Sequence, residues 1–244
     1  MIVLFTDFGS RSAYVGQMHM VLHRCAPGVP VADLLHDAPA YNPKAAAYLL
    51  GAYTNEFRPG DVLLGVVDPG VGGDRRPIVV DCDGVLCVGP DNGLFIGLVV
   101  QAKRPVRVWR IDWRPESLSA SFHGRDIFAP VAARLARGLK PAGTNIRAVD
   151  LVGTDWPDQL AEVIHIDPFG NAMTGLVAGN IPAHAQVSIA GRKLEKAKTF
   201  SSISPGNAFW YENANGLLEI AVNQGRAADL LGLAVGDPIA FLDI

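Results

Sequence analysis

The sequence predicts an α/β protein in two domains: a mainly parallel N-terminal sheet flanked by helices, and a smaller, mostly antiparallel β domain. In the first part, short apolar runs alternate with segments of helical periodicity, a pattern typical of a parallel sheet covered by helices. The pattern changes at VGTDWPDQLAE, where Gly, Asp and Pro cluster, and short strand candidates follow. We therefore expect an N-terminal domain over residues 1–155 and a C-terminal domain over residues 162–244.

The elements of the first domain follow from the spacing of its apolar residues. Buried strands are predicted where short apolar runs end in turn residues: Ile2–Phe5, Val31–Leu35 and Asp61–Val67. The stretch PIVVDCDGVLCVG predicts a hairpin with its turn at Asp83-Gly84. Proline at a first helical turn and glycine at a C-terminal cap help to place the helices. These are predicted over Tyr14–Cys25, from Pro43, from Asn92 and over Ile127–Gly138.

The second domain has shorter elements. Strands are predicted over Val163–Ile166, Gln186–Ile189 and Leu217–Val222, with a turn at Gly191 and a short helix over Ala227–Leu231. Short strands separated by turn residues favour an antiparallel sheet.

Composition excludes several classes of function. Hydrophobic residues make up 49% of the 244 residues and charged residues 18%, so the chain can bury a large core. A net charge of −3 and scattered Lys and Arg give no footprint for nucleic acid or for a membrane surface. No apolar stretch approaches the roughly 20 residues of a membrane span. Three cysteines without metal-ligand spacing and a start without a signal-peptide pattern lead us to expect a cytoplasmic protein.

Polar side chains gather in four loops. TDFG (6–9) and VVDPGVGGDRR (66–76) each follow a predicted buried strand of the first domain. Because ligands of open α/β sheets bind beyond the carboxyl ends of the strands, we expect these two loops to face one crevice. SASFHGRDIFAP (119–130) sets His, Arg and Asp among phenylalanines, and IDPFGNAMTG (166–175) opens the second domain. Charges in apolar surroundings indicate either a structural ion pair or a reacting centre.

Each residue considered alone also has a structural interpretation. Asp7 could stabilise a turn or cap a helix, and Asp68 before Pro-Gly could be an ordinary turn residue. Asp126 could be the N-cap of the helix that carries Pro130, and an isolated His123 is more often structural than catalytic.

Several familiar motifs are missing from the sequence. It has no G-x-S-x-G elbow, no Walker loop and no G-x-G-x-x-G after a strand. His19 and His23 are spaced i, i+4 and could bind a metal, but no HExxH motif or third ligand accompanies them. We therefore assign no metal site.

Taken together, the loops resemble one family. TDFG, DPGVG followed by Arg75, GPDNG, FHGRDIFAP, IDPFGN and NGLLEIA stand in the order of the S-adenosyl-L-methionine (SAM) hydrolases, also called SAM hydroxide adenosyltransferases. These are relatives of the SAM-dependent fluorinase and chlorinase. The resemblance spans essentially the whole chain and implies a C-terminal β-barrel-like domain and a homotrimer. It further implies a substrate pocket shared between neighbouring subunits.

The resemblance also implies a reaction and its catalytic residues. Water or hydroxide attacks the ribose C5′ of SAM and yields adenosine and L-methionine, without a cofactor or a metal. The triad of the hydrolase branch falls on Asp68, Arg75 and His123. The halogenating relatives replace the aspartate with Tyr and the His-Gly pair with Tyr-Ser. They also carry Thr at the position of Val71, so the chain looks like a hydrolase. With Asp68 orienting it, His123 is expected to accept the proton of the attacking water.

Substrate contacts carry over by motif position. Asp7 matches the partner of the ribose hydroxyls, and Tyr41 and Phe122 match aromatic positions around the substrate. Asp167 matches the partner of the methionine amine, and Phe200 matches an adenine-stacking ring. The remaining substrate-binding positions expected from the motifs are Phe8, Phe169, Asn171, Asn213, Asn215, Val222 and Gln224.

Three positions depart from the family pattern. Ser12 stands where relatives usually have Asp, Ala214 where they have Ser, and Gly175 where they have Asn. The first two lie near the expected methionine end. They leave open a weakened pocket, a different sulfonium or 5′-substituted nucleoside as the substrate, and a nucleoside- or SAM-binding or sensory protein without turnover. A SAM-dependent halogenase is a separate and more distant alternative.

Overall fold

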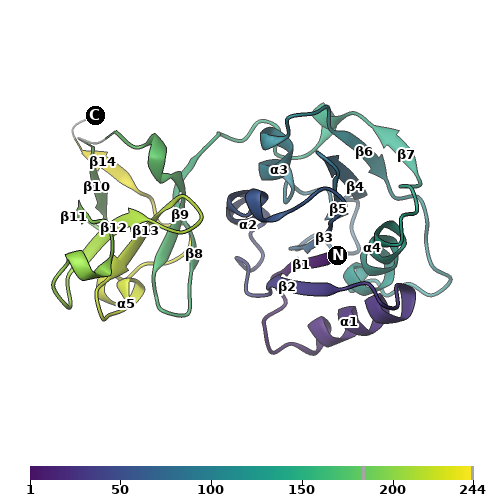
Figure 1. Ribbon diagram of the computed structural model, residues 1–244, viewed down its shortest axis with the longest axis horizontal. Helices are drawn as coiled ribbons and strands as arrows, with labels where there is room; N and C mark the ends of the chain where they lie inside the picture. Colours follow the sequence, from purple (N-terminus) through teal and green to yellow (C-terminus); the bar gives the residue numbers. More distant parts are fainter. Residues whose placement is uncertain (183–184, 243–244) are drawn as a thin grey trace. The chain divides into compact units, whose positions relative to one another are not determined.

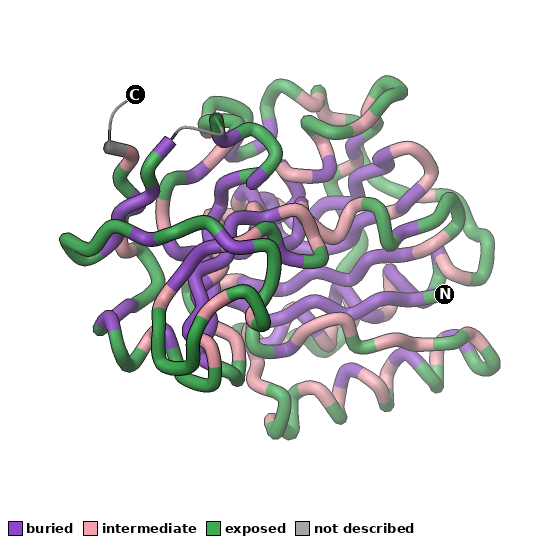
Figure 2. The backbone as a smooth tube through the Cα atoms, turned by 60° about the vertical axis from the view of Figure 1, so that its left-hand side comes forward, coloured by how far each residue is buried: buried purple, intermediate pink, exposed green. Residues whose placement is uncertain are grey.

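The computed structural model describes residues 1–182 and 185–242 and confirms the α/β class (Figure 1). The chain forms two compact units, Met1–Trp156 and Pro157–Ile244, and each is built on its own seven-stranded sheet. Strands Ile2–Thr6, Val62–Val66, Pro77–Cys82 and Leu217–Val222 are buried along their whole length, and Figure 2 marks buried residues in purple along the backbone.

The sheet of the first unit is half parallel and half antiparallel. The parallel half has the order β2 (Val31–Leu35), β1 (Ile2–Thr6), β3 (Val62–Val66) and β5 (Val85–Pro90). The antiparallel half continues with β4 (Pro77–Cys82), β6 (Arg107–Arg110) and β7 (Thr144–Ile146). The order has a switch point at β1, because β2 lies on one side of it and β3 on the other. Such a point is where open α/β sheets bind ligands.

Helices cover the parallel half. Helix α1 (Ala13–Cys25) packs against α4 (Ala129–Ala136), and α2 (Pro43–Ala52) packs against α3 (Ile96–Gln101). The fully buried side chains of Met18 and Leu22 on α1 join Leu4 and Leu64 of the strands in one core cluster. A π-helical turn, Gly124–Phe128, leads directly into α4, and two short 3-10 turns cover Thr54–Glu56 and Ala148–Asp150.

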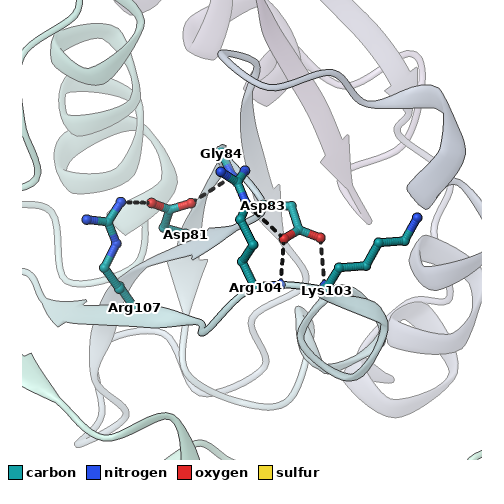
Figure 3. A network of polar contacts seen from close by, with 6 residues as sticks. All are labelled: Asp81, Asp83, Gly84, Lys103, Arg104 and Arg107. Atoms are coloured by element: carbon teal, nitrogen blue, oxygen red, sulfur yellow. Dashed lines mark hydrogen bonds and ion pairs between the residues drawn. The ribbon is translucent and has the colours of Figure 1, made fainter.

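The predicted β4–β5 hairpin turn is confirmed, and carboxylates hold it (Figure 3). Asp81 accepts hydrogen bonds from the Gly84 backbone N–H at 2.9 Å and from the Arg107 guanidinium at 2.5 Å. Asp83 has a φ of +54° and accepts the backbone N–H groups of Lys103 and Arg104 at 2.8 and 2.9 Å. Aspartate suits this turn because its short side chain tolerates left-handed backbone and bonds to nearby N–H groups.

The sheet of the second unit is nearly closed and barrel-like. Its strands pair antiparallel except for β11 with β12, which are parallel. Ile239, just before the last strand, donates its N–H to the Ala161 carbonyl of the first strand at 2.8 Å, which brings the two edges together. The order is β14 (Ala240–Leu242), β10 (Gln186–Ile189), β11 (Arg192–Lys196), β12 (Ala208–Glu212), β13 (Leu217–Val222), β9 (Ala172–Val177) and β8 (Leu160–Ile166). The unit also contains the short helix α5 (Ala227–Leu231) and 3-10 turns at Ala178–Asn180 and Phe200–Ser202.

Candidate active site

A cavity of about 390 Å³ lies in the first unit beyond the carboxyl ends of β1 and β3. This volume is within the range of small-molecule sites, roughly 300–1,000 Å³. The loop after β1 contributes Asp7, and the loop after β3 contributes Asp68, so the two predicted loops do face one crevice. The lining consists of Asp7, Phe8, Tyr14, Tyr41, Val66, Asp68, Pro69, Val71, Ser121, Phe122, His123 and Gly124.

Three side chains from two loops form one hydrogen-bonded chain at the cavity. The Nε atom of Arg75 donates to both carboxylate oxygens of Asp68 at 3.0 Å, and its Nη2 donates to Oδ2 at 2.5 Å. The same Nη2 lies 2.9 Å from Nδ1 of His123. The side chains of Asp68 and Arg75 are only 5% and 10% exposed, so water screens this ion pair little.

The order of the contacts determines the state of the histidine. Arg75 lies between Asp68 and His123, so the carboxylate orients the ring through the guanidinium and not directly as expected from the motifs. A guanidinium can only donate, so Nδ1 of His123 must accept. The neutral ring therefore carries its proton on Nε2. Burial lowers the pKa of His123 below its usual value, and the Arg75 charge lowers it further, outweighing the opposite effect of Asp68.

Aromatic rings surround the triad. The Arg75 guanidinium lies 5.2 Å from the ring centre of Phe128, which is fully buried. The ring of Phe122 makes edge contacts with Phe8 at 5.7 Å and with Tyr14 at 4.9 Å. These rings form an apolar wall on the side of the cavity that Phe122 lines.

Asp7 and Tyr41 are linked at the cavity rim. The backbone N–H of Tyr41 donates to Oδ2 of Asp7 at 3.1 Å. Burial raises the pKa of Asp7, this hydrogen bond partly offsets the effect, and the nearby charge of Asp68 adds to the rise. Tyr41 has a φ of +58° and a side chain that is 81% exposed. A left-handed non-glycine residue is uncommon and marks a constrained loop.

The loop of Asp68 and Arg75 meets the loop of His123 at a glycine. A Cβ atom at Gly72 would lie 2.5 Å from the carbonyl oxygen of Ala120, and the φ of Gly72 is +80°. A larger residue would therefore push the loop of Asp68 and Arg75 away from the loop of His123.

Arg125 and Asp126 anchor the loop that precedes them. Nε and Nη2 of Arg125 donate to Asp126 at 2.6 and 3.0 Å, and Asp126 also accepts the Ser119 backbone N–H at 2.8 Å. Nη1 of Arg125 donates to Gln17 of α1 at 3.0 Å. Asp126 is not the N-cap of α4, because the chain reaches that helix through the π-helical turn and Phe128 occupies the cap position without a side-chain bond.

In the second unit, Asp167, Phe169 and Asn171 lie in the loop between β8 and β9. The carboxylate of Asp167 accepts the Asn171 backbone N–H at 2.8 Å and its side-chain amide at 3.1 Å. Phe169 is 76% exposed.

A buried acid extends this group. Glu219 on β13 accepts from the Tyr211 hydroxyl at 2.6 Å and from the Asn213 amide at 2.8 Å. Burial raises the pKa of Glu219, and the charge of Asp167 adds to the rise, so Asp167 lies within electrostatic reach of this network. Its buried charge in an otherwise apolar strand was the available sequence signal for Glu219.

The other candidate residues of this unit occupy turns and an aromatic cluster. Asn213 accepts the backbone N–H groups of Asn215 and Leu217 at 2.9 and 3.0 Å. The ring of Phe200 lies 5.2 Å from that of Phe209 and 5.3 Å from that of Tyr211. Val222 is buried at the end of β13, and Gln224 has a φ of +55° in the turn that follows.

Two of the three departures have structural roles. The hydroxyl of Ser12 accepts the Tyr14 backbone N–H at 3.2 Å and caps α1. A Cβ atom at Gly175 would lie 2.6 Å from Cβ of Leu160 on the neighbouring strand, so β8 and β9 approach too closely for an asparagine there. Ala214 is exposed, and nothing in the structure explains it.

Sequence reasoning missed several lining residues. Tyr14 was assigned only to a helix, although its ring contacts Phe8 at 5.9 Å and its side chain remains 53% exposed. A tyrosine in the first turn of a helix that follows TDFG was the available signal. Val66, Pro69, Ser121 and Gly124 line the cavity through their positions beside expected residues.

Comparison with known proteins identifies the family. The model of the SAM hydroxide adenosyltransferase N-terminal domain matches residues 2–145, and that of the C-terminal domain matches residues 161–240. The chain belongs to the SAM hydroxide adenosyltransferase family. No helix in the described part of the chain is long and apolar enough to cross a membrane.

Relatives match along almost their whole length. The (R)-S-adenosyl-L-methionine hydrolase of Salinispora arenicola is 39% identical, with 96% of this chain and 94% of the relative covered. The protein of the same name from Thermus thermophilus is 37% identical, with 99% of each covered. Among solved structures, an uncharacterized conserved protein from Thermotoga maritima matches with a TM-score of 0.86 at 30% identity, and 99% of each chain is covered.

Proposed function

We propose that this member of the family hydrolyses SAM to adenosine and L-methionine. The oxygen of water bonds to the ribose C5′, the C5′–S bond breaks with its electron pair on sulfur, and one proton is released. The observation that carries the proposal is the hydrogen-bonded chain of Asp68, Arg75 and His123 at the cavity beyond the carboxyl ends of β1 and β3. Because relatives are named for the (R) form of SAM, we propose that sulfonium epimer as the preferred substrate.

In this proposal the three side chains have different roles, which the hydrogen-bonding pattern supports. His123 presents Nε2–H as a donor, since its Nδ1 accepts from Arg75. This N–H holds the oxygen of the attacking water with a lone pair directed at C5′. Asp68 lines the cavity and is the anion of the triad, so it takes the proton as the C5′–O bond forms. Arg75 fixes both groups. This assignment replaces His123 as the base with Asp68.

The apolar wall favours the reaction on electrostatic grounds. A hydroxide-like nucleophile and a sulfonium lose charge as they react, so exclusion of water lowers the barrier. Phe8, Tyr14 and Phe122 supply that wall. Sulfur leaves as a neutral thioether, which needs no acid. Holding the water against C5′ contributes several kcal/mol through positioning.

The substrate contacts follow the motif positions. In this proposal Asp7 accepts from the ribose hydroxyls, and Phe8, Tyr41 and Phe122 border the sugar. From the second unit of a neighbouring subunit, Asp167 holds the methionine amine and Phe200 stacks on adenine. The other proposed substrate-binding residues there are Phe169, Asn171, Asn213, Asn215, Val222 and Gln224.

The remaining expectations are also proposals. We propose a homotrimer, supported by the family resemblance and by the exposed rings of Tyr41 and Phe169. Free thiols at Cys25, Cys82 and Cys87 support a cytoplasmic location. The reaction needs no cofactor, because the leaving group is already activated as a sulfonium.

The test is incubation of the purified chain with each sulfonium epimer of SAM, followed by chromatography. We expect adenosine and methionine in equal amounts and, in ¹⁸O-labelled water, label in the adenosine 5′-hydroxyl. Calorimetric binding of adenosine without any product would instead support a binding protein. A 5′-chloro nucleoside that forms only with chloride would support a halogenase.

A further inference from the structure

Three potential metal ligands from α1, from β2 and from the residue just after β2 come together, and none of them lines the cavity described above. Nε2 of His19 on α1 lies 2.8 Å from Oδ1 of Asp33 on β2, and Nε2 of His36, just after β2, lies 3.1 Å from the same oxygen. The three ligand atoms all lie within 4.8 Å of one another. β2 is an edge strand of its sheet, so this group forms where the sheet ends.

His36 is the decisive member of the group. Its side chain is 7% exposed, and its Nε2 is buried without an acceptable hydrogen bond despite the short distance to Asp33. Its Nδ1 lies 2.8 Å from the Thr6 hydroxyl oxygen, which also accepts the Phe8 backbone N–H at 3.3 Å. An Nδ1–H directed at Thr6 leaves the lone pair of Nε2 facing Asp33 and His19. Metal-binding histidines are commonly oriented in this way through their other nitrogen.

An ordinary ion-pair interpretation explains less. It requires an Nε2–H on His36, either in the protonated ring or in the neutral tautomer whose Nδ1 accepts from the Thr6 hydroxyl. That N–H would point at Asp33 with poor geometry in a buried position. Both imidazoles approach the same carboxylate oxygen, a crowding that a single ion between the three atoms relieves.

We propose that His19, Asp33 and His36 bind one divalent transition-metal ion of the zinc class. Two imidazole nitrogens and one carboxylate oxygen are a ligand set that Zn²⁺ prefers, with solvent as the fourth ligand. Bonds of about 2.0–2.1 Å place tetrahedral ligands roughly 3.3 Å apart. The contacts of 2.8 and 3.1 Å therefore need to open by only a few tenths of an ångström on binding. This inference does not depend on the proposed hydrolase function.

The ion has a structural consequence. It ties α1 to β2, and through Thr6 it braces the end of β1, where the chain enters the loop of Asp7 and Phe8. His36 also accepts the Gly9 backbone N–H on its carbonyl at 2.7 Å, so both ends of this loop rest on His36.

The test uses the full chain without an affinity tag, stripped of metal by a chelator. We expect titration with ZnCl₂, followed by calorimetry and by metal analysis after dialysis, to give one equivalent per chain. Co²⁺ should give the intense visible bands of a tetrahedral site. Asp33→Asn and His19→Ala, both at side chains that are partly exposed, should weaken binding at least about tenfold.

His23→Ala is the matched control, because His23 lies one turn from His19 on α1 but outside the group. It should bind zinc as the unchanged chain does. Zinc should raise the thermal midpoint of the unchanged chain and of His23→Ala, and leave that of Asp33→Asn unchanged. Absence of binding, equal affinity in all variants, or loss of binding in His23→Ala would each overturn the proposal.

Discussion

Two arginine–aspartate pairs lie near the cavity and differ in what surrounds them. Arg75 and Asp68 are 10% and 5% exposed, and the guanidinium continues to a third group, His123. Arg125 and Asp126 are adjacent in sequence and 33% and 13% exposed, and their further hydrogen bonds are to Ser119 and Gln17. The Arg125 guanidinium also lies 5.1 Å from the ring centre of Phe122. Similar ion-pair chemistry therefore serves different ends. The pair that holds a titratable group at a cavity is the catalytic candidate, and the pair that holds a loop is an anchor.

The largest effect is expected when the first pair is broken. Asp68→Asn should lower kcat by about 10²–10⁴-fold, because the amide cannot take the proton. The matched change Asp126→Asn should leave kcat close to that of the unchanged chain. Steady-state assays of both variants, with circular dichroism to confirm folding, check the contrast. Equal losses in the two variants would erase the distinction between the pairs.

The next effect separates two roles for His123. Glutamine places an amide N–H near the position of Nε2, so His123→Gln should keep much more activity than His123→Ala if the ring is a donor. A ring that accepts the proton would lose comparable activity in both variants, since glutamine is no base. Single-turnover rates with saturating SAM make this comparison without interference from product release.

A pH profile sharpens the same point. The pKa of His123 is lowered, so the neutral ring persists below its usual titration range, and activity should fall only as the pH drops below about 6.5. Protonation would place a cation against Arg75 and remove the acceptor at Nδ1. The unfolded chain binds this proton at a higher pH than the folded chain, so stability should also decrease as the pH falls through this range. In His123→Gln this acidic limb should disappear from kcat/KM.

The smallest effect concerns the second pair alone. Asp126→Asn removes the charge that accepts from Arg125 and Ser119, and should cost on the order of 1–3 kcal/mol of unfolding free energy. Urea denaturation measures this loss. If kcat also fell by more than a few-fold in the fully folded variant, the anchor would have to be counted with the catalytic machinery.

Much of the fold could be predicted from local sequence patterns. The strands at Val31–Leu35 and Leu217–Val222 and the turn at Asp83-Gly84 depend on side chains close in sequence, and they were found. In the antiparallel half of the first sheet, β6 and β7 were missed, because they are short and their pairing depends on distant partners. The helix expected from Asn92 starts only at Ile96, after a turn in which the Asn92 side chain bonds backbone groups.

The residues of the site could be predicted from the sequence, but their arrangement could not. Asp68, Arg75 and His123 were named from motifs, and the structure brings them into contact. The sequence did not predict that Arg75 lies between Asp68 and His123. This arrangement depends on how two loops pack together, and Arg75 and His123 are 48 residues apart in the chain. The metal group illustrates the same limit. His23 is the obvious partner of His19 in sequence, whereas the folded chain offers Asp33 and His36.

The acidic side chains around the cavity have a consequence for turnover. Asp7 and Asp68 line it, Arg75 neutralises one of them, and no lysine or arginine is among the described lining residues. Such a pocket attracts a positively charged sulfur ligand. Once the bond to carbon breaks, the sulfur is neutral and that attraction is gone. Cleavage of the C–S bond therefore lowers the affinity of the pocket for the product. Uncharged thioether analogues of the substrate should be poor inhibitors for the same reason.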